Sequence, residues 1–181
     1  MVKTKLEQEI IDAIGARAAS HGIDVVDVDV TGATKAPLVR VRIDWADGRP
    51  ITLDEVSANT GWVSDAIDEL DPIASAYTLE VSSPGMARPL RRPADVIAHV
   101  GDAVELTTTA VFGRRSYKGA IESADEAGLT IAPEDGEPVT FSYDEVKKCT
   151  LSPVYDFKGG VSARSENNGE DGAAAPEKEG K

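Results

Sequence analysis

The start of the chain has the apolar periodicity of an amphipathic helix. Thr4 and Glu7 have the spacing of an N-terminal capping box, and Gly22 is placed to end the helix. Apolar residues between these signals recur three and four positions apart, along one stripe: Leu6, Ile10, Ile11, Ile14 and Ala18. The pattern therefore predicts a helix that begins after Thr4 and ends before Gly22.

Two alternating segments follow and predict a β-hairpin. Valines alternate with aspartates over residues 26–30, and valine or isoleucine alternates with arginine over residues 39–43. If the apolar side chains share the buried face, the register places Asp29 opposite Arg40 and Asp27 opposite Arg42. Opposite charges that face each other across strands reinforce this register.

Residues 52–70 predict a second amphipathic helix, and a third strand follows it. Thr52 and Glu55 repeat the capping-box spacing, and Asp71 with the following proline ends the helix. Gly61 costs about 1 kcal/mol relative to alanine inside a helix, so it indicates either close packing or a local weakness. The apolar stripe consists of Leu53, Val56, Thr60, Val63, Ile67 and Leu70. Tyr77, Leu79 and Val81 then alternate as in a strand, so residues 1–83 predict an N-terminal α-β-β-α-β two-layer domain.

Beyond this domain the composition changes. Residues 84–93 are rich in proline, glycine and arginine and predict a linker. Residues 94–157 predict a short helix at 94–99 and then strands at 103–108, 116–122, 129–132, 139–143 and 149–151, which is the spacing of a small all-β barrel. Residues 158–181 contain no aromatic residue and predict a disordered tail. The fold class is thus α+β with two domains.

The charge distribution narrows the choice of partner. The chain has 19 basic and 32 acidic residues, a net charge of −13, and residues 1–85 alone contain 7 basic and 15 acidic residues. A phosphate backbone repels such a chain except where its cations are gathered, whereas a basic protein is attracted to it. The single cysteine fits a reducing compartment, and residues 1–5 lead into an amphipathic pattern rather than the apolar stretch of a signal peptide. We therefore expect a cytoplasmic protein.

The most specific segment runs from Tyr77 to Leu90, as a strand that enters a turn. Pro84 fixes its φ angle and Gly85 is free to take the positive φ of a type II turn, so we expect this pair to form an interdomain turn. The segment resembles the signature of the RimP family, in which a leucine-glutamate-valine-serine-serine-proline-glycine run is followed two residues later by arginine-proline-leucine. Residues 79–85 and 88–90 match this pattern completely, and looser agreement extends over residues 4–155.

The resemblance implies a fold and a function. RimP proteins have an α/β N-terminal domain and a C-terminal SH3-like (Sm-type) barrel. They are ribosome maturation factors, or assembly chaperones, that bind the immature small ribosomal subunit and a basic ribosomal protein near the decoding centre. The resemblance implies no catalytic residue and no cofactor, and it transfers no role to an individual residue.

Clustered arginines are the candidate partner-binding residues. Arg88, Arg91 and Arg92 form one cluster, which either contacts a partner or pairs with acidic residues of the first domain. Arg114 and Arg115 lie in a predicted hairpin loop, where they are candidates to contact RNA or an acidic patch. Trp62 lies off the apolar stripe of its helix, so it is either an exposed anchor or a residue partly buried against the sheet edge.

Other chemistries lack support in the sequence. Ser82 and Ser83 do not lie in a nucleophile elbow, and turn capping explains them better. Asp27, Asp29 and Asp44 lack calcium-loop spacing, and one cysteine with two histidines cannot assemble a cysteine- and histidine-rich zinc site, so we expect no metal. An α-β-β-α-β order also resembles a KH RNA-binding module, but the one Gly-x-x-Gly sequence, Gly169 to Gly172, falls in the acidic tail. An enzyme that acts on ribosomal RNA is the third alternative, and it lacks a phosphate-binding loop.

Overall fold

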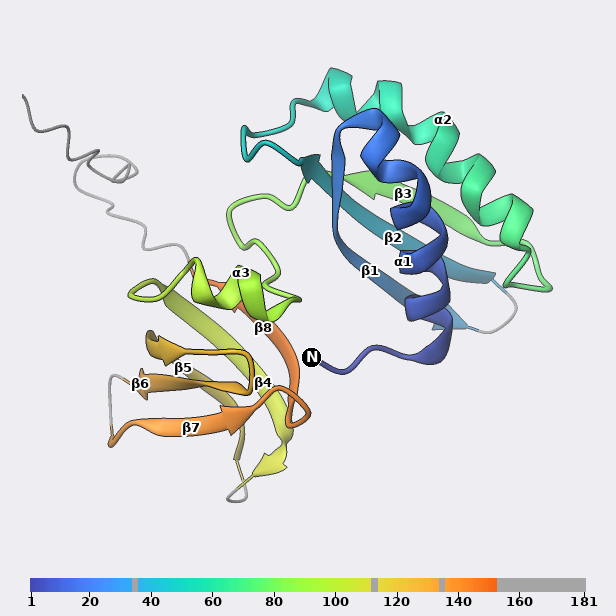
Figure 1. Cartoon of the computed structure of the whole chain (residues 1–181). Coiled ribbons are helices and arrows are strands. Elements are labelled where there is room, and N and C mark those ends of the chain that lie inside the picture. Colours follow the sequence, from blue (N-terminus) through green and yellow to red (C-terminus); the bar gives the residue numbers. More distant parts are fainter. Residues whose placement is uncertain (34–35, 112–113, 134–135, 153–181) are drawn as a thin grey trace, which may run out of the picture.

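A computed structural model describes residues 1–33, 36–111, 114–133 and 136–152 of the 181-residue chain. Figure 1 shows two separate units, each built on its own sheet. The first unit contains the elements α1 to β3, and the second contains α3 to β8. The predicted tail lies outside the described residues.

The first unit is the α-β-β-α-β layer structure that the sequence predicts. Its helices and strands are α1 (Lys5–Ala18), β1 (Ile23–Ala33), β2 (Ala36–Trp45), α2 (Leu53–Leu70) and β3 (Thr78–Ser82), with a 3-10 turn, η1 (Ala19–His21), after α1. Both predicted capping boxes are present, and Gly22 ends η1 with a φ of 66°. The sheet order is β1-β2-β3, with β1 and β2 antiparallel and β2 and β3 parallel. Both helices cover one face of this sheet (Figure 1).

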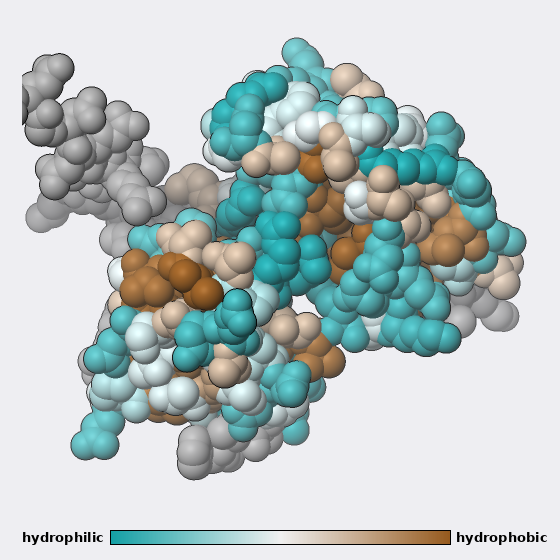
Figure 2. Space-filling view, viewed as in Figure 1, coloured by the Kyte–Doolittle hydropathy of each residue, from teal (hydrophilic) through white to brown (hydrophobic). Residues whose placement is uncertain are grey.

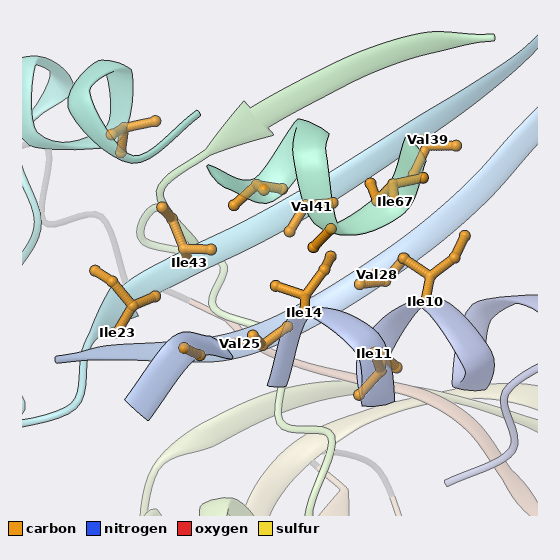
Figure 3. Close-up of a cluster of buried hydrophobic side chains, with 14 of the residues drawn as sticks. Ile10, Ile11, Ile14, Ile23, Val25, Val28, Val39, Val41, Ile43 and Ile67 are labelled. Carbon is orange, nitrogen blue, oxygen red and sulfur yellow. The ribbon is translucent and has the colours of Figure 1, made fainter. Parts of the chain in front are cut away.

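The core of this unit lies between the helices and the sheet. Ile10 and Ile14 of α1 and Ile67 of α2 point toward the apolar face of β1 and β2 (Figure 3). On the sheet side they meet Val28, Val39, Val41 and Ile43, none of which is exposed to solvent. Burial of this set is the main driving force for the two-layer arrangement.

The register of the hairpin is as predicted, with one irregularity. Asp27 pairs with Arg42 and Asp29 with Arg40, but a bulge interrupts the register between Val25 and Asp27. Because the bulge adds a residue to β1, Val25 rather than Val26 faces the first core. The prediction that Val26 shares the core face with the other valines is wrong for that reason.

The second unit is an antiparallel sheet with the order β7-β6-β5-β4-β8. It begins with the short helix α3 (Pro93–Ile97), and its strands are β4 (Ala103–Val111), β5 (Arg114–Ala124), β6 (Gly128–Pro133), β7 (Val139–Ser142) and β8 (Val146–Leu151). All five predicted strands are thus present. No pairing between the outer strands β7 and β8 closes the sheet among the described residues, so the predicted SH3-like barrel is not confirmed.

A second core lies within this unit, and residues 84–93 contribute to it. Leu90, within the predicted linker, is fully buried in the second core together with Leu106, Phe141 and Cys149. Cys149 is a small buried apolar residue, as is common for free cysteines, and burial raises the pKa of its thiol to about 12.

Candidate interaction site

The linker arginines lie against the first unit, and Arg88 is the first of them. Its guanidinium donates a hydrogen bond to one carboxylate oxygen of Asp44, at the end of β2. The other oxygen of Asp44 accepts hydrogen bonds from the backbone amides of Trp45 and Ile51 at 3.0 and 3.1 Å. The Asp44 carboxylate is nearly buried, so these three donors replace the water that it has lost.

Arg92 makes a second, bidentate ion pair with the first unit. Its two terminal nitrogens each lie 2.7 Å from one carboxylate oxygen of Asp24. It also donates to Asp95 of α3, and these hydrogen bonds, that to Asp24 first, raise the pKa of the Arg92 guanidinium. Burial by itself would raise the pKa of Asp95, but the bonds from Arg92 lower it on balance. Arg92 therefore joins an acid of the first sheet to one of the second unit.

Arg91 contacts the backbone of β1 instead of an acid. Its Nε and one terminal nitrogen donate to the carbonyl oxygens of Val26 and Val25, both at 3.2 Å. The bulge at these residues directs two successive carbonyls to one side of the strand. The alternative in which the linker arginines pair with acids of the first unit thus holds for Arg88 and Arg92 but not for Arg91, and binding of a partner by these residues stays a prediction.

Four charged side chains cluster on the open face of the first sheet, which is the face opposite the two helices (Figure 1). Lys3 Nζ lies 2.7 Å from Asp27 and 3.1 Å from Asp29, and Arg42 lies 2.7 Å from Asp29. Burial raises the pKa of Asp27 despite Lys3 and Arg42. Burial would also raise the pKa of Asp29, but Arg42 and Lys3 lower it on balance. Two acids and two bases therefore balance each other, and Arg40, opposite Asp29, instead pairs with Glu80 of β3 at 2.7 Å.

The first three residues also connect the two units. The amide of Val2 donates to the carbonyl of Val146 in β8, and Met1 packs against the second core. A small cavity at this junction is lined by Met1, Lys3, Asp27, Asp29, the linker and β8. Figure 2 shows that hydrophilic residues gather where the two units approach each other, which agrees with a junction held by ion pairs. The role of Lys3 could not be predicted from the sequence, because nothing in its local pattern indicates its tertiary partners.

The predicted turn has the geometry that its residues favour. Gly85 has a φ of 66°, in the left-handed region, and a Cβ at this position would meet no atom within 4 Å. Pro84 and Gly85 line a cleft with Gly48, Pro50 and Ile51 of the first unit and with Arg88. The turn lies between the end of β3 and the Arg88–Asp44 ion pair, so it is well placed to set the path of the linker.

Arg114 and Arg115 occupy a different place, at the start of β5. Both are exposed, and among the described residues neither forms an ion pair. Arg114 donates to the carbonyl of Ser116 at 2.6 Å, and its guanidinium lies 5.0 Å from the centre of the Tyr117 ring. The structure thus separates the five candidate arginines into three at the junction and two on the second sheet.

The outer face of the second sheet carries further cations near this strand. Lys148 of β8 and Ser116 of β5 both pair with Thr107 of β4, so these residues form one row across three strands. In the adjacent row, Lys118 of β5 pairs with Glu105 of β4 at 3.1 Å. The exposed polar row and the adjacent arginines offer donors to phosphates or to carboxylates.

Of the two alternatives for Trp62, an exposed anchor or a partly buried residue, the structure supports partial burial. Its ring stacks on His21, with the ring centres 4.5 Å apart and the planes 5° apart, and its Nε1 donates to Asn59. Trp62 is packed against the first core rather than presented as an anchor.

Within the described residues, no group of three or more metal-binding side chains is arranged around a common point, and no helix has the length and apolar character to cross a membrane. The charged residues described above can form ion pairs and hydrogen bonds with a macromolecule. Residues 13–87 match the family model described as the RimP N-terminal domain, a span that contains most of the first unit and the signature turn. This match agrees with the resemblance carried by the signature and shows that residues 13–87 are a domain of the RimP N-terminal family.

Proposed function

We propose that the chain is a non-catalytic ribosome maturation factor that binds the immature small ribosomal subunit in the cytoplasm. Its main stable partner is a basic ribosomal protein near the decoding centre, and ribosomal RNA is a secondary contact. The observation that carries this proposal is the RimP N-terminal domain at residues 13–87, since RimP is a family of ribosome maturation factors. No cofactor takes part. In this proposal the second unit acts as an SH3-like domain.

The charge distribution supports a basic protein as the main partner. Residues 1–85 have a net charge of −8, from 7 basic and 15 acidic residues. RNA would have to approach against this field, whereas a basic protein is attracted by it and associates quickly. Arg88 and Arg92 are held in ion pairs with Asp44 and Asp24, so each offsets one acidic residue of this unit.

The exposure of Arg114 and Arg115 supports them as the RNA contact. They are exposed and have no carboxylate partner among the described residues, so a phosphate would not have to displace one. A factor of this kind works by differential affinity: it binds the surface of an assembling subunit and is released when that surface matures.

Two binding measurements test this proposal. Purified protein should retain a basic decoding-region ribosomal protein in a pull-down that weakens with salt, and should bind naked ribosomal RNA poorly at physiological ionic strength. Tight binding to naked RNA, without a protein partner, would instead support an RNA-binding module.

A pair of variants then tests the RNA contact. Arg114→Glu with Arg115→Glu should weaken binding to precursor subunits more than binding to the isolated ribosomal protein. Lys5→Glu with Arg17→Glu is the matched control, because it makes the same change in net charge on α1. Equal losses for the two double variants would show that net charge alone is responsible and would exclude a local role for Arg114 and Arg115.

A further inference from the structure

Most of the outer strand edges that the structure describes are covered. On β1, the side chains of Arg91, Lys3 and Glu7 hydrogen-bond the outward backbone groups. These groups are the carbonyls of Val25 and Val26 at 3.2 Å and of Val28 at 2.7 Å, and the amide of Val30 at 3.0 Å. Since an unpaired edge is a template for another strand, these three side chains close the edge of β1.

The edges of the second sheet are covered or short. Backbone groups of β8 bond to Val2, Leu90 and the carbonyl of Arg88, so two segments lie along its outer side. The opposite strand, β7, has four residues, and the amide of Ser142 at its end donates to Glu145. Because the amide of Ser142 is already bonded, this four-residue strand has fewer backbone groups left for an added strand.

The outer edge of β3 differs from these. The strand is five residues long, from Thr78 to Ser82, and it pairs with β2 on one side only. On its other side, its backbone groups make no hydrogen bond with any described part of the chain. Figure 1 shows β3 at the border of the first sheet, below α2. The backbone groups on this side are therefore available to a further strand.

We propose that this edge of β3 is the docking site for an extended, basic segment of a protein partner, which adds to the first sheet as a fourth strand. The proposal rests on the proposed function, because it states where a basic ribosomal protein would bind. Main-chain hydrogen bonds to β3 would supply affinity, and the side chains on either side of the edge would supply selectivity.

Glu80 supports a basic occupant. Its side chain lies on the open face of the sheet in the middle of β3, remains 43% exposed, and already pairs with Arg40 on the neighbouring strand. A lysine or arginine on an added strand would be its second cross-strand neighbour, on the side opposite Arg40. On the other face, Leu79 and Val81 are only partly buried at the border of the first core. The edge thus favours a segment in which basic and apolar residues alternate.

The same residue argues against a second copy of this chain as the occupant. An antiparallel pair of β3 strands, centred on the middle of the strand, would place Glu80 opposite its own copy. Like charges directly opposite each other destabilise a strand pair. A basic partner avoids this repulsion, and the acidic first unit attracts it from a distance.

Hydrogen exchange of the full chain tests the docking site. The probes are a basic decoding-region ribosomal protein and a short peptide of alternating lysine and valine residues. Either probe should slow exchange at residues 78–82 and leave β7 unchanged. A peptide with a central proline should protect less, because it lacks an amide for the added strand. Exchange at residues 78–82 that is unchanged by a bound probe would overturn the proposal.

A matched pair of charge reversals tests the role of Glu80. Glu80→Lys should weaken binding of both probes about tenfold, whereas Asp65→Lys, on the exposed face of α2, should change it little. Glu80→Gln keeps a side chain that hydrogen-bonds Arg40 and should give an intermediate loss, which separates binding from a folding defect. If the wild type binds well and Glu80→Lys and Asp65→Lys lose equal affinity, the edge of β3 is not the docking site, but the proposed function still holds. If the wild type binds precursor subunits but no basic protein, the choice of partner fails as well.

Discussion

Glu55 shows how a local motif and a tertiary contact act on one carboxylate. One of its oxygens accepts hydrogen bonds from the amide and hydroxyl of Thr52 at 2.8 and 2.9 Å, and the other accepts one from Arg49 at 2.9 Å. Bonding to the charged form lowers the pKa of Glu55 to about 2, with the Thr52 amide as the largest cause and Arg49 next. The carboxylate also lies in the first turn of α2, where negative charge is favourable.

This arrangement predicts a titration that can be measured. In an NMR titration of carboxyl carbons, the pKa of Glu55 should be about 2 in the folded protein. Arg49→Ala should raise it toward 4.5, the value of an unperturbed glutamate, and Lys5→Ala, at an exposed position of α1, should leave it unchanged. Because the folded pKa is the lower one, the contribution of Glu55 to stability is present above pH 4.5 and is lost as pH falls through about 2. A wild-type value near 4.5 would contradict the capping geometry.

At the scale of elements, two glycines have opposite environments. Gly61 lies in α2, and a Cβ built on it meets no atom within 4 Å. Of the two interpretations of this glycine, the structure therefore supports local weakness rather than close packing. Gly119 lies in β5, and a Cβ there would overlap the carbonyl oxygen of Ala132 in β6. Backbone atoms cannot move aside cheaply, so β5 needs glycine at this position.

These environments predict opposite effects for the same substitution. Gly61→Ala should raise the free energy of unfolding by up to about 1 kcal/mol, since alanine is the better helix former. Gly119→Ala should lower it by about 1–3 kcal/mol, because β5 and β6 must separate. Urea denaturation of both variants measures the two changes. A stabilised Gly119→Ala protein would mean that β6 does not approach β5 so closely.

Elements that depend on interactions between residues close in the sequence could be predicted, whereas features that depend on distant residues could not. Capping boxes, helical periodicity and the Asp71 stop are local, so α1 and α2 could be predicted with nearly their observed bounds. The bulge at Val26 could not be predicted, since it depends on pairing between strands. At the candidate site, pairing of the linker arginines with the first unit was one of two open alternatives. The contact of Arg91 with two carbonyls had no sequence signal, because any backbone can supply them.

At the scale of the whole molecule, the relation of the two units depends on the junction contacts. Arg88 and Arg92 each reach an acid of the first unit, and both pairs are partly shielded from solvent. Pairs of this kind contribute more than fully exposed ones, and salt screens them less. The junction is nevertheless polar and partly exposed, so its strength should depend on these few residues.

Removal of these arginines should therefore loosen the arrangement of the units. Arg88→Ala with Arg92→Ala should increase the radius of gyration in small-angle X-ray scattering, while circular dichroism shows that both units stay folded. Arg114→Ala with Arg115→Ala removes the same charge from residues that form no ion pair with any described residue, and it should leave the scattering unchanged. Identical scattering from the two double variants would show that other contacts, such as that of Val2 with Val146, hold the units.

The last prediction concerns the turn that leads into these contacts. Gly85→Val places its Cβ where no atom lies within 4 Å, so we expect its effect to come mainly from the cost of a positive φ. That cost is about 1–2 kcal/mol for a residue with a side chain. It is comparable to one partly shielded ion pair, so the Arg88–Asp44 and Arg92–Asp24 pairs together should hold the linker at low salt.

At high salt, where these pairs weaken, the strained turn should open and the spacing between the units in the scattering profile should increase. Gly85→Asn is the matched control, because asparagine tolerates this region of φ, and it should behave like the wild type at both salt concentrations. If Gly85→Val keeps the wild-type profile at high salt, the turn does not set the placement of the units, and the buried contacts of Leu90 with the second core become the feature that does.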